Sequence, residues 1–431
     1  MGSFRITRWL GVAGAAVVAS SLSVAAGYAP ADATATRRAD ERWVAAWAAS
    51  PVVGTEIPGS SCPAGAGLRD HTVRNVVFVS VGGSRLRVRL TNAFGTQPLR
   101  IGHASVAVQQ ADATPAPDSL RELTFGGATG TVIPAGEELF SDPVALAVAP
   151  LSTLLISVHV PEPTGPVTNH PFTAQGNFLA GGDKTLAGDG AAFAPTPCWM
   201  LADGVDVDAQ DGLLRGSVVA LGDSITDTAN TTGNANRRWP DFLARRLNIT
   251  DGPTMSVVNA GLGGNRLLEP RAGEPYYGVP ALLRLDRDVL AQSGARTVIL
   301  LEGINDIGFD ATADALIAGY REIAGRVHAA GLKIIGGTIT PFGGSAIWSP
   351  SRQATWDAVN TWIRTGGAFD GVIDFAAATA VAGDPLTLDP RYDSGDHLHP
   401  NDAGTEAMAN AVDVSALFPE VFPAAAAHRV A

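Results

Sequence analysis

Ser224 is the first candidate for a nucleophile in this chain. It follows an apolar run at 218–221 and stands in the sequence Gly222-Asp223-Ser224-Ile225, where a buried strand passes into a turn. Ligands of open α/β sheets bind just beyond the carboxyl ends of such strands. Glycine, aspartate and serine are also common turn residues, so this tripeptide by itself favours an ordinary turn. The assignment of a nucleophile therefore depends on partners elsewhere in the chain.

A base and an acid that can orient it stand together near the C-terminus. In Asp396-His397-Leu398-His399, the carboxylate lies three residues before the second imidazole and can fold back to its Nδ1 atom. A serine, an imidazole and a carboxylate are the groups of nucleophilic acyl transfer. His397 directly follows Asp396, and this spacing makes the carboxylate contact awkward. His399 is therefore the predicted base.

Two more strand ends supply hydrogen-bond donors. The run 256–259 leads into the glycine-rich loop 260–265, where the backbone can approach a ligand closely. The run 297–301 ends in a Glu-Gly-Ile-Asn sequence that places the amide of Asn305 at a third strand end. Such donors stabilise the oxyanion that forms during acyl transfer. Together the four stretches contain the groups that an acyl hydrolase needs.

In this order, the four stretches resemble the four blocks of the SGNH (GDSL-type) hydrolase family. The family's four residues fall on Ser224, Gly264, Asn305 and His399. The resemblance covers about residues 215–415, and Ile225 stands where the name-giving leucine of the family usually stands. It implies a flavodoxin-like three-layer α/β/α domain with a parallel sheet. It also implies a carboxylic ester hydrolase that needs no cofactor and no metal.

The resemblance also implies a role for each site residue. His399 takes the proton of the Ser224 hydroxyl as its oxygen attacks the ester carbonyl, and Asp396 orients the imidazole ring. The backbone N–H groups of Ser224 and Gly264 and the side-chain amide of Asn305 receive the oxyanion.

Three interpretations are alternatives to an SGNH-type esterase. An α/β-hydrolase elbow needs Gly-x-Ser-x-Gly, but Thr226 stands at the position of the second glycine. A metal-dependent phosphodiesterase would leave Ser224 and the glycine loop without a purpose. Its ion would be held by residues among Asp223, Asp306, Asp396, His397 and His399. A non-catalytic binding protein on a hydrolase scaffold would not need a complete set of reactive groups.

From Arg215 onward, strand-like and helix-like segments alternate. Strands are predicted around residues 218–221, 256–259, 297–301, 333–340 and 371–375. Helices are predicted around residues 239–247, 280–292, 312–330, 352–364 and 401–412. This alternation predicts a parallel sheet between layers of helices, with the candidate catalytic residues at one edge.

The preceding part of the chain has a different pattern. Strand-like runs at 76–81, 86–90 and 154–160 are separated by glycine and proline turns, and no helical pattern of useful length occurs. A β-sandwich, in the form of a jelly roll, is predicted. Cys62 and Cys198 are the only cysteines, and in an oxidising compartment they are predicted to form one disulfide.

Two features of this β-rich region have alternative interpretations. Trp43, Trp47 and Trp199 could form a glycan-binding surface or fill the core, and the sequence leaves both open. The acidic stretch 203–211 is interpreted as a solvated crossing into the second domain. A calcium loop is the alternative, but the full twelve-residue ligand pattern and its closing glutamate are missing.

The N-terminus has the pattern of a secretory signal peptide. Arg5 and Arg8 precede an apolar stretch, and small residues follow it. A membrane anchor is the alternative, because 9–26 is nearly long enough to span a bilayer. The chain is predicted to have three parts: a signal peptide at 1–35, a β-sandwich domain at 36–205 and an SGNH hydrolase domain at 212–420. A secreted, extracellular protein is expected.

The charge of the chain limits its partners. The 431 residues carry a net charge of −12 with no long basic run, so neither nucleic acid nor an anionic membrane surface is a predicted partner. The predicted substrate is a small-molecule or polysaccharide ester, with acetyl or feruloyl esters on polysaccharides favoured. Lipase or lysophospholipase activity on acyl lipids is the alternative. The oligomeric state is not predicted.

Overall fold

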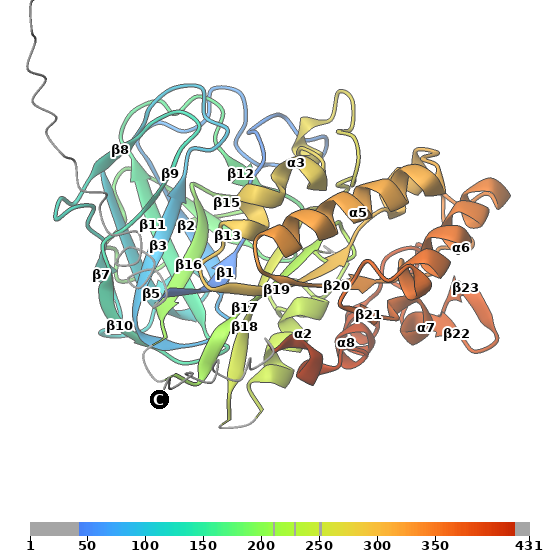
Figure 1. Ribbon diagram of the computed structural model, residues 1–431. Coiled ribbons are helices and arrows are strands. Elements are labelled where there is room, and N and C mark those ends of the chain that lie inside the picture. Colours follow the sequence, from blue (N-terminus) through green and yellow to red (C-terminus); the bar gives the residue numbers. More distant parts are fainter. Residues whose placement is uncertain (1–42, 210–211, 228–229, 250–251, 419–431) are drawn as a thin grey trace, which may run out of the picture.

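The computed structural model describes residues 43–209, 212–227, 230–249 and 252–418. They form a β-rich lobe and an α/β lobe that lie side by side (Figure 1). The predicted signal peptide lies outside the described residues. Within these ranges, no helix has the length and apolar character needed to cross a membrane.

The β-rich lobe contains two larger antiparallel sheets. The first has the order β1 (Trp43–Ala48), β16 (Ala202–Asp208), β3 (Gly83–Thr91) and β10 (Val144–Val148), with β9 (Glu138–Phe140) paired to β3. The second has the order β14 (Ala194–Thr196), β13 (Asn177–Gly181), β2 (His71–Phe78), β11 (Thr153–Val160), β5 (His103–Ala111) and β6 (Thr114–Pro115), with β7 (Arg121–Glu122) paired to β5. Two short pairs complete the lobe: β12 (Asn169–His170) with β15 (Trp199–Met200), and β4 (Leu99–Ile101) with β8 (Thr131–Ile133). The predicted β-rich fold is confirmed.

Strand β1 joins the two lobes. Ala46 and Trp47 lie in the apolar core of the β-rich lobe, whereas Ala45 and Ala48 lie in the core of the α/β lobe. Side chains of a strand alternate between its two faces, so one short strand can contribute to both cores. The successive residues Ala46 and Trp47 share a core because the register of β1 against β16 shifts between Ala45 and Trp47. The backbone N–H of Ala45 also donates to the carbonyl of Ser293 in the α/β lobe (2.9 Å). The two lobes are therefore joined through β1, which contributes side chains to both apolar cores.

The interpretation of the acidic stretch as a solvated linker is wrong for residues 203–208. These residues form most of β16, which lies between β1 and β3. Asp203 pairs with Arg89 at 2.8 Å, and Asp206 pairs with Arg87 at 2.8 Å. The arginines of β3 thus supply the charges and hydrogen bonds that allow these aspartates to be buried.

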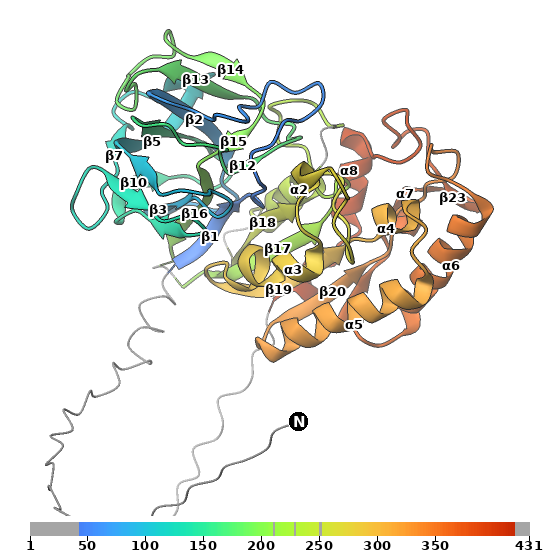
Figure 2. The ribbon, with the colours of Figure 1, turned by 90° about the horizontal axis from the view of Figure 1, so that it is seen from above.

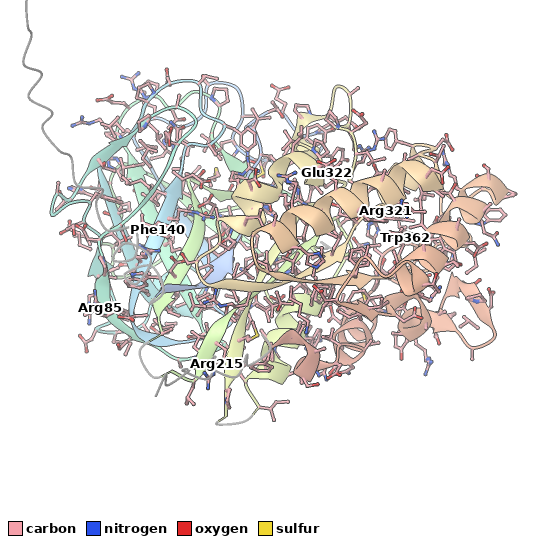
Figure 3. The ribbon with its side chains drawn as sticks, viewed as in Figure 1. Arg85, Phe140, Arg215, Arg321, Glu322 and Trp362 are labelled. Atoms are coloured by element: carbon pink, nitrogen blue, oxygen red, sulfur yellow. A yellow bond between two sulfur atoms is a disulfide. The ribbon has the colours of Figure 1, made fainter. Side chains whose placement is uncertain are left out.

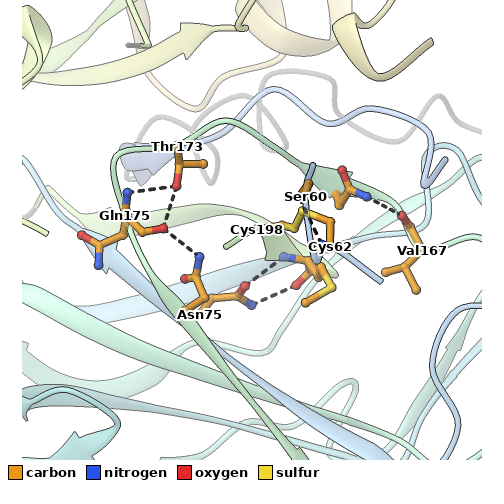
Figure 4. Close-up of a disulfide and its surroundings, with 10 residues drawn as sticks. Ser60, Cys62, Asn75, Val167, Thr173, Gln175 and Cys198 are labelled. Carbon is orange, nitrogen blue, oxygen red and sulfur yellow. Dashed lines mark hydrogen bonds between the residues drawn. A yellow bond between two sulfur atoms is a disulfide. The ribbon is translucent and has the colours of Figure 1, made fainter. Parts of the chain in front are cut away.

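The disulfide predicted between Cys62 and Cys198 is present, with the two Cα atoms 5.9 Å apart (Figure 4). It ties the loop after β1 to the strand β15 region, across a separation of 136 residues. In the chain-entropy model, closing a loop this long contributes on the order of 4 to 5 kcal/mol to stability.

The three tryptophans of the β-rich lobe are buried. Trp43, Trp47 and Trp199 are 8%, 5% and 2% exposed, and the rings of Trp47 and Trp199 pack edge to face at 5.5 Å. They fill the interior, so they do not form a glycan-binding surface.

The α/β lobe is built on a parallel sheet. Its strand order is β18 (Thr254–Gly261), β17 (Leu214–Gly222), β19 (Ala295–Leu301), β20 (Lys333–Gly337) and β21 (Gly371–Ile373). The main helices are α2 (Trp239–Leu247), α3 (Ala281–Leu285), α5 (Ala313–Ala329), α6 (Pro350–Thr365) and α8 (Asp402–Asn410). Shorter segments are the π-helical turn η2 (Asp286–Leu290), the 3₁₀ turns η1 (Pro275–Tyr277) and η3 (Val414–Leu417), α4 (Ile304–Gly308), α7 (Phe375–Thr379) and the hairpin of β22 (Ala380–Val381) with β23 (Asp384–Leu388).

Helices cover both faces of this sheet, as predicted. Helices α3 and α5 lie on one face and α2 and α8 on the other (Figure 2). At the packed surface of α5 and α6, Tyr320 stacks on Trp362 at 5.9 Å and Arg321 lies over the same ring (Figure 3). The predicted helix at 280–292 is divided, because α3 continues as the π-helical turn η2.

Three strand ends meet at the carboxyl edge of the sheet. Gly222 of β17 is paired with Gly261 of β18 on one side and with Leu301 of β19 on the other. The chain segments that follow these three residues are the Ser224 turn, the glycine loop and the Asn305 segment. The parallel fold thus brings together stretches that lie far apart in the sequence.

Candidate active site

Ser224, His399 and Asp396 form one hydrogen-bonded chain. Ser224 Oγ lies 2.8 Å from His399 Nε2, and His399 Nδ1 lies 2.6 Å from Asp396 Oδ2. Asp396 Oδ1 also accepts the backbone N–H of His399 (2.8 Å). Partial burial opposes ionisation of Asp396, but the hydrogen bonds from the side chain and backbone of His399 hold its pKa well below the ordinary value. An ionised carboxylate therefore faces the imidazole Nδ1.

Hydrogen bonds to the backbone and to the side chain of Asp223 hold the turn that carries Ser224. The backbone N–H groups of Thr226 and Asp227 donate to the carbonyl of Asp223 (3.1 and 3.0 Å). The Asp223 carboxylate accepts the N–H of Ile225 (2.9 Å). A side chain at Gly222 would overlap Thr226 Oγ1, so the close turn requires glycine at that position.

His397 has a different partner. Its Nδ1 lies 2.7 Å from Asp393 Oδ2, and its side chain is 55% exposed. Of the two imidazoles, His399 is therefore the one that contacts Ser224 Oγ.

The glycine loop presents Gly264 beside an aromatic ring. Gly264 has φ +70°, and a Cβ atom there would overlap the ring of Tyr277. Both the backbone conformation and the lack of space require glycine. Among the described residues, the backbone N–H groups of Gly264 and Ser224 donate to no acceptor. These two donors are free to receive a ligand oxygen.

Asn305 is attached to the same loop. Its side-chain Nδ2 donates to the carbonyl of Asn265 at 2.9 Å, which leaves the second N–H of the amide for another acceptor. The neighbouring Asp306 accepts the backbone N–H groups of Leu267 (2.7 Å) and Leu268 (3.1 Å). The Asn305 segment and the glycine loop therefore hold each other in place.

Asp223 and Asp306 are used by backbone amides, as described above. No group of three or more histidine, cysteine, aspartate or glutamate side chains in the described ranges is arranged to hold a metal ion. Ser224, His399 and the free backbone N–H groups lie together at this edge, an arrangement that can carry out nucleophilic acyl transfer.

Arg284 is a buried cation that the sequence reasoning missed. Its guanidinium donates to the carbonyls of Gly222 (2.9 Å) and Ala260 (2.7 Å), at the ends of β17 and β18. It also donates to Asn265 Oδ1 (2.8 Å) and pairs with Asp288 (3.2 Å). One side chain thus connects two strand ends to the glycine loop. An arginine on the apolar side of the predicted helix at 280–292 was the available indication.

Asp223 is buried beneath the nucleophile turn. Burial raises its pKa to about 7, against the hydrogen bond from the backbone of Ile225. Burial likewise raises the pKa of Glu302, which lies 3.5 Å from Arg284. Several carboxyl groups therefore share one buried arginine at this edge.

The raised pKa of Asp223 predicts a pH-dependent stability difference. Folded Asp223 keeps a proton that the unfolded chain releases above about pH 4, so its contribution to stability falls as pH rises from about 4 to about 7. Asp223→Asn removes this penalty and keeps an oxygen for the Ile225 N–H. The melting temperature of Asp223→Asn relative to wild type is expected to rise between about pH 5 and about pH 8. Differential scanning fluorimetry measures the melting temperatures of the variant and of the wild type at each pH.

Asp310→Asn is the matched control, because Asp310 is exposed and a hydrogen bond from Arg352 lowers its pKa. Its small effect has the opposite sign: the variant loses stability relative to wild type as pH rises. A pH-independent difference for Asp223→Asn would refute a protonated Asp223 in the fold.

The β-rich lobe contacts the nucleophile turn through His170. This buried ring faces two acceptors: Nδ1 lies 2.6 Å from the carbonyl of Ser50, and Nε2 lies 2.5 Å from Asp227 Oδ2. Burial raises the pKa of Asp227, but the charges of His170 and Arg238 outweigh it and lower that pKa. No local motif indicated this contact in the sequence.

Residues 220–407 match the sequence model of the GDSL-like lipase/acylhydrolase family. No curated protein matches the chain. The family match covers the segment that carries Ser224, Gly264, Asn305 and His399.

Three similar solved structures are enzymes. The inhibitor-bound aryl esterase of M. smegmatis is 16% identical, with a TM-score of 0.38, and the match covers 47% of this chain and 99% of that chain. A catalytic mutant of an acetylxylan esterase from Geobacillus stearothermophilus is 21% identical (TM-score 0.37; 47% and 94%). A carbohydrate acetylesterase from Sinorhizobium meliloti is 16% identical (TM-score 0.37; 47% and 99%).

The family match and the arrangement of the strand ends concern the same residues. The match begins within β17 and ends within α8, so it includes the end of β17, the other four strands of the parallel sheet and all the candidate site residues. The chain therefore carries a GDSL-like lipase/acylhydrolase domain at residues 220–407, and it is a carboxylic ester hydrolase.

Proposed function

We propose that the protein is a secreted serine esterase that uses Ser224 as nucleophile, His399 as general base and Asp396 as the group that orients the base. The observation that carries this proposal is the hydrogen-bonded chain from Ser224 Oγ through His399 to Asp396. The N-terminal pattern at 1–35 and the disulfide support export to an oxidising compartment.

The mechanism follows from these contacts. His399 Nε2 accepts the Ser224 proton while Oγ attacks the ester carbonyl, and the imidazolium then gives this proton to the leaving alcohol. The N–H groups of Ser224 and Gly264 and the Asn305 amide stabilise the oxyanion, and losing one such donor typically costs roughly 100 to 1000-fold in rate. Water then attacks the acyl-enzyme by the same route, with His399 again as base.

The substrate is proposed to be an acetyl or feruloyl ester on a polysaccharide. The support is the polar rim around Asp396. Ser394 Oγ lies 3.3 Å from Asp396 Oδ1 and accepts from Asn230 Nδ2 (3.0 Å), while the exposed His397 stands next to them. Polar groups that keep their hydration suit a sugar alcohol better than a lipid chain.

A panel of esters tests this function. We expect kcat/KM to be highest for p-nitrophenyl acetate and for acetylated xylan. We expect it to fall steadily as the acyl chain lengthens towards laurate, because a long apolar acyl chain would contact the polar rim of the site. Exhaustive chelation is expected to leave these rates unchanged. Preference for lysophospholipid or laurate would replace the polysaccharide proposal with the lipid one. A chelator-sensitive activity that a divalent ion restores would contradict the serine mechanism.

A further inference from the structure

Segment 170–178 of the β-rich lobe runs along the boundary with the α/β lobe. Near its start, the ring of Phe172 stacks on Tyr277 at 5.5 Å, and a Cβ atom at Gly263 of the glycine loop would meet the Phe172 side chain. Further along, the carbonyl of Ala174 accepts the backbone N–H of Asn234 at 2.7 Å. One segment therefore connects the oxyanion side of the active site to a second region between the lobes.

That second region contains a cleft of about 360 Å³. One wall is formed by strands of the second antiparallel sheet, from which Gln109, Thr153 and Phe178 line it. The other wall is formed by Asn234 and Asn236 of the α/β lobe. Its size falls in the range of small-ligand sites, and clefts between domains are a frequent place for them.

The structure holds the walls of the cleft in a fixed arrangement. Thr173 Oγ1 accepts the N–H of Gln175 at 3.0 Å and so closes a local turn (Figure 4). Asn234 Oδ1 accepts from the backbone of Gly176 (2.7 Å) and from Gln175 Nε2 (2.9 Å). Asn177 Oδ1 accepts the N–H of Val76 (2.8 Å). These amides are used to build the site.

Other polar groups in the cleft have no partner in the described ranges. Gln109 donates through Nε2 to the carbonyl of Asp112 (2.7 Å), which leaves its Oε1 unused. The side chain of Asn236, the hydroxyl of Thr153 and the Nδ2 of Asn234 make no hydrogen bond with described residues. The free groups thus include donors and acceptors, and they stand beside the half-buried ring of Phe178.

We propose that this cleft binds a neutral saccharide chain. Sugar hydroxyls both donate and accept hydrogen bonds, which matches the amides and the hydroxyl of the lining, and the carboxylate of Asp112, which also lines the cleft, can accept from them. Among the described residues that line the cleft there is no arginine or lysine, so a phosphate or carboxylate ligand lacks the cation it requires and faces the negative charge of Asp112. The aromatic ring of Phe178 supplies an apolar face for a sugar ring.

The proposal rests on the proposed function, because it assigns the alcohol part of the ester substrate to the cleft. Phe172 and Gln175 are three residues apart, so their Cα atoms are separated by at most about 11 Å. An oligosaccharide in the cleft therefore reaches towards the glycine loop, where a sugar bearing the ester meets Ser224.

Calorimetry with an inactive enzyme tests the cleft directly. Full-length Ser224→Ala is titrated with xylohexaose, cellohexaose and chitohexaose, and at least one of them is expected to bind. Adding Gln109→Ala or Phe178→Ala is expected to weaken that binding by roughly tenfold, since each removes a direct contact. Gln110→Ala is the matched control, because the adjacent Gln110 is exposed and does not line the cleft. It is expected to bind as the parent does.

Thr153→Arg is a second variant, which fills the cleft without removing a hydrogen bond to the described residues. In otherwise wild-type enzyme, the cleft variants are expected to raise KM for acetylated xylooligosaccharides and to leave kcat/KM for p-nitrophenyl acetate unchanged. Thermal unfolding confirms that each variant is folded.

Two results would overturn the cleft proposal: binding of none of the three oligosaccharides, or equal binding by the parent, Gln109→Ala, Phe178→Ala and Thr153→Arg. Failure of the proposed esterase function would give a different experimental result. Wild-type enzyme would then hydrolyse no ester of the panel, while calorimetry would still report whether the cleft binds sugar.

Discussion

Ser224→Ala and His399→Ala are each expected to lower kcat/KM for p-nitrophenyl acetate by roughly 10⁴-fold or more while the protein stays folded. The first removes the oxygen that forms the acyl-enzyme. The second removes the group that accepts its proton at 2.8 Å. Steady-state kinetics measures the loss, and thermal unfolding checks the fold. Combining both changes should cost little more than either alone, because the two residues act as one unit.

His397→Ala is the matched control for the base. His397 lies two residues from His399 but pairs with Asp393 rather than with Ser224. The variant is therefore expected to keep most of the wild-type activity. If it proved as inactive as His399→Ala while remaining folded, the assignment of the base would be wrong.

Arg284→Met is expected to have the largest effect on stability. The guanidinium is 1% exposed, donates to the ends of β17 and β18, and pairs with the buried Asp288 and Glu302. Removing one partner of a buried ion pair leaves an uncompensated charge and typically costs about 3 to 5 kcal/mol. Urea unfolding measures the loss. A reduced kcat in any folded fraction is also expected, because Arg284 holds Asn265 in the glycine loop.

Two further variants separate charge and geometry at this position. Arg284→Lys keeps the charge but not the planar fork, so it should recover only part of the lost stability. Arg321→Met is the control, because Arg321 lies exposed on α5 over the ring of Trp362. Its effect should stay within about 1 kcal/mol. Equal stabilities for Arg284→Met and Arg321→Met would contradict the structural role of Arg284.

Much of the α/β lobe could be predicted because its signals are local. Aliphatic runs such as 218–221 and 297–301 are typical of strands buried on both faces, and the structure places them at the centre of the sheet. The contact of His399 with Asp396 was predictable from a spacing of three residues. The contact with Ser224 followed from the rule that parallel strand ends meet at one edge.

The errors and omissions concern contacts between distant segments. The aspartates at 203–208 looked like a solvated linker, because their partners Arg87 and Arg89 lie more than a hundred residues earlier. Arg284 and His170 carry no motif, and their importance appears only when the strand ends and the two lobes come together. Local patterns predict elements and motifs, whereas the pairing of buried charges depends on tertiary structure.

The β-rich lobe also contacts the loops that carry the candidate active-site residues. His170 contacts Asp227 within the turn that follows Ser224, and Phe172 contacts the glycine loop. Because His170 and Asp227 are both buried, the two lobes are expected to behave as one catalytic unit.

Covalent labelling tests whether Ser224 is the nucleophile. The wild-type enzyme is incubated with diethyl p-nitrophenyl phosphate, a serine-directed organophosphate, and its peptides are analysed by mass spectrometry. We expect one diethylphosphoryl group on Ser224, loss of activity in step with labelling, and no label in Ser224→Ala or His399→Ala. Full inactivation with the label on another residue, or full activity with Ser224 completely labelled, would contradict Ser224 as the nucleophile.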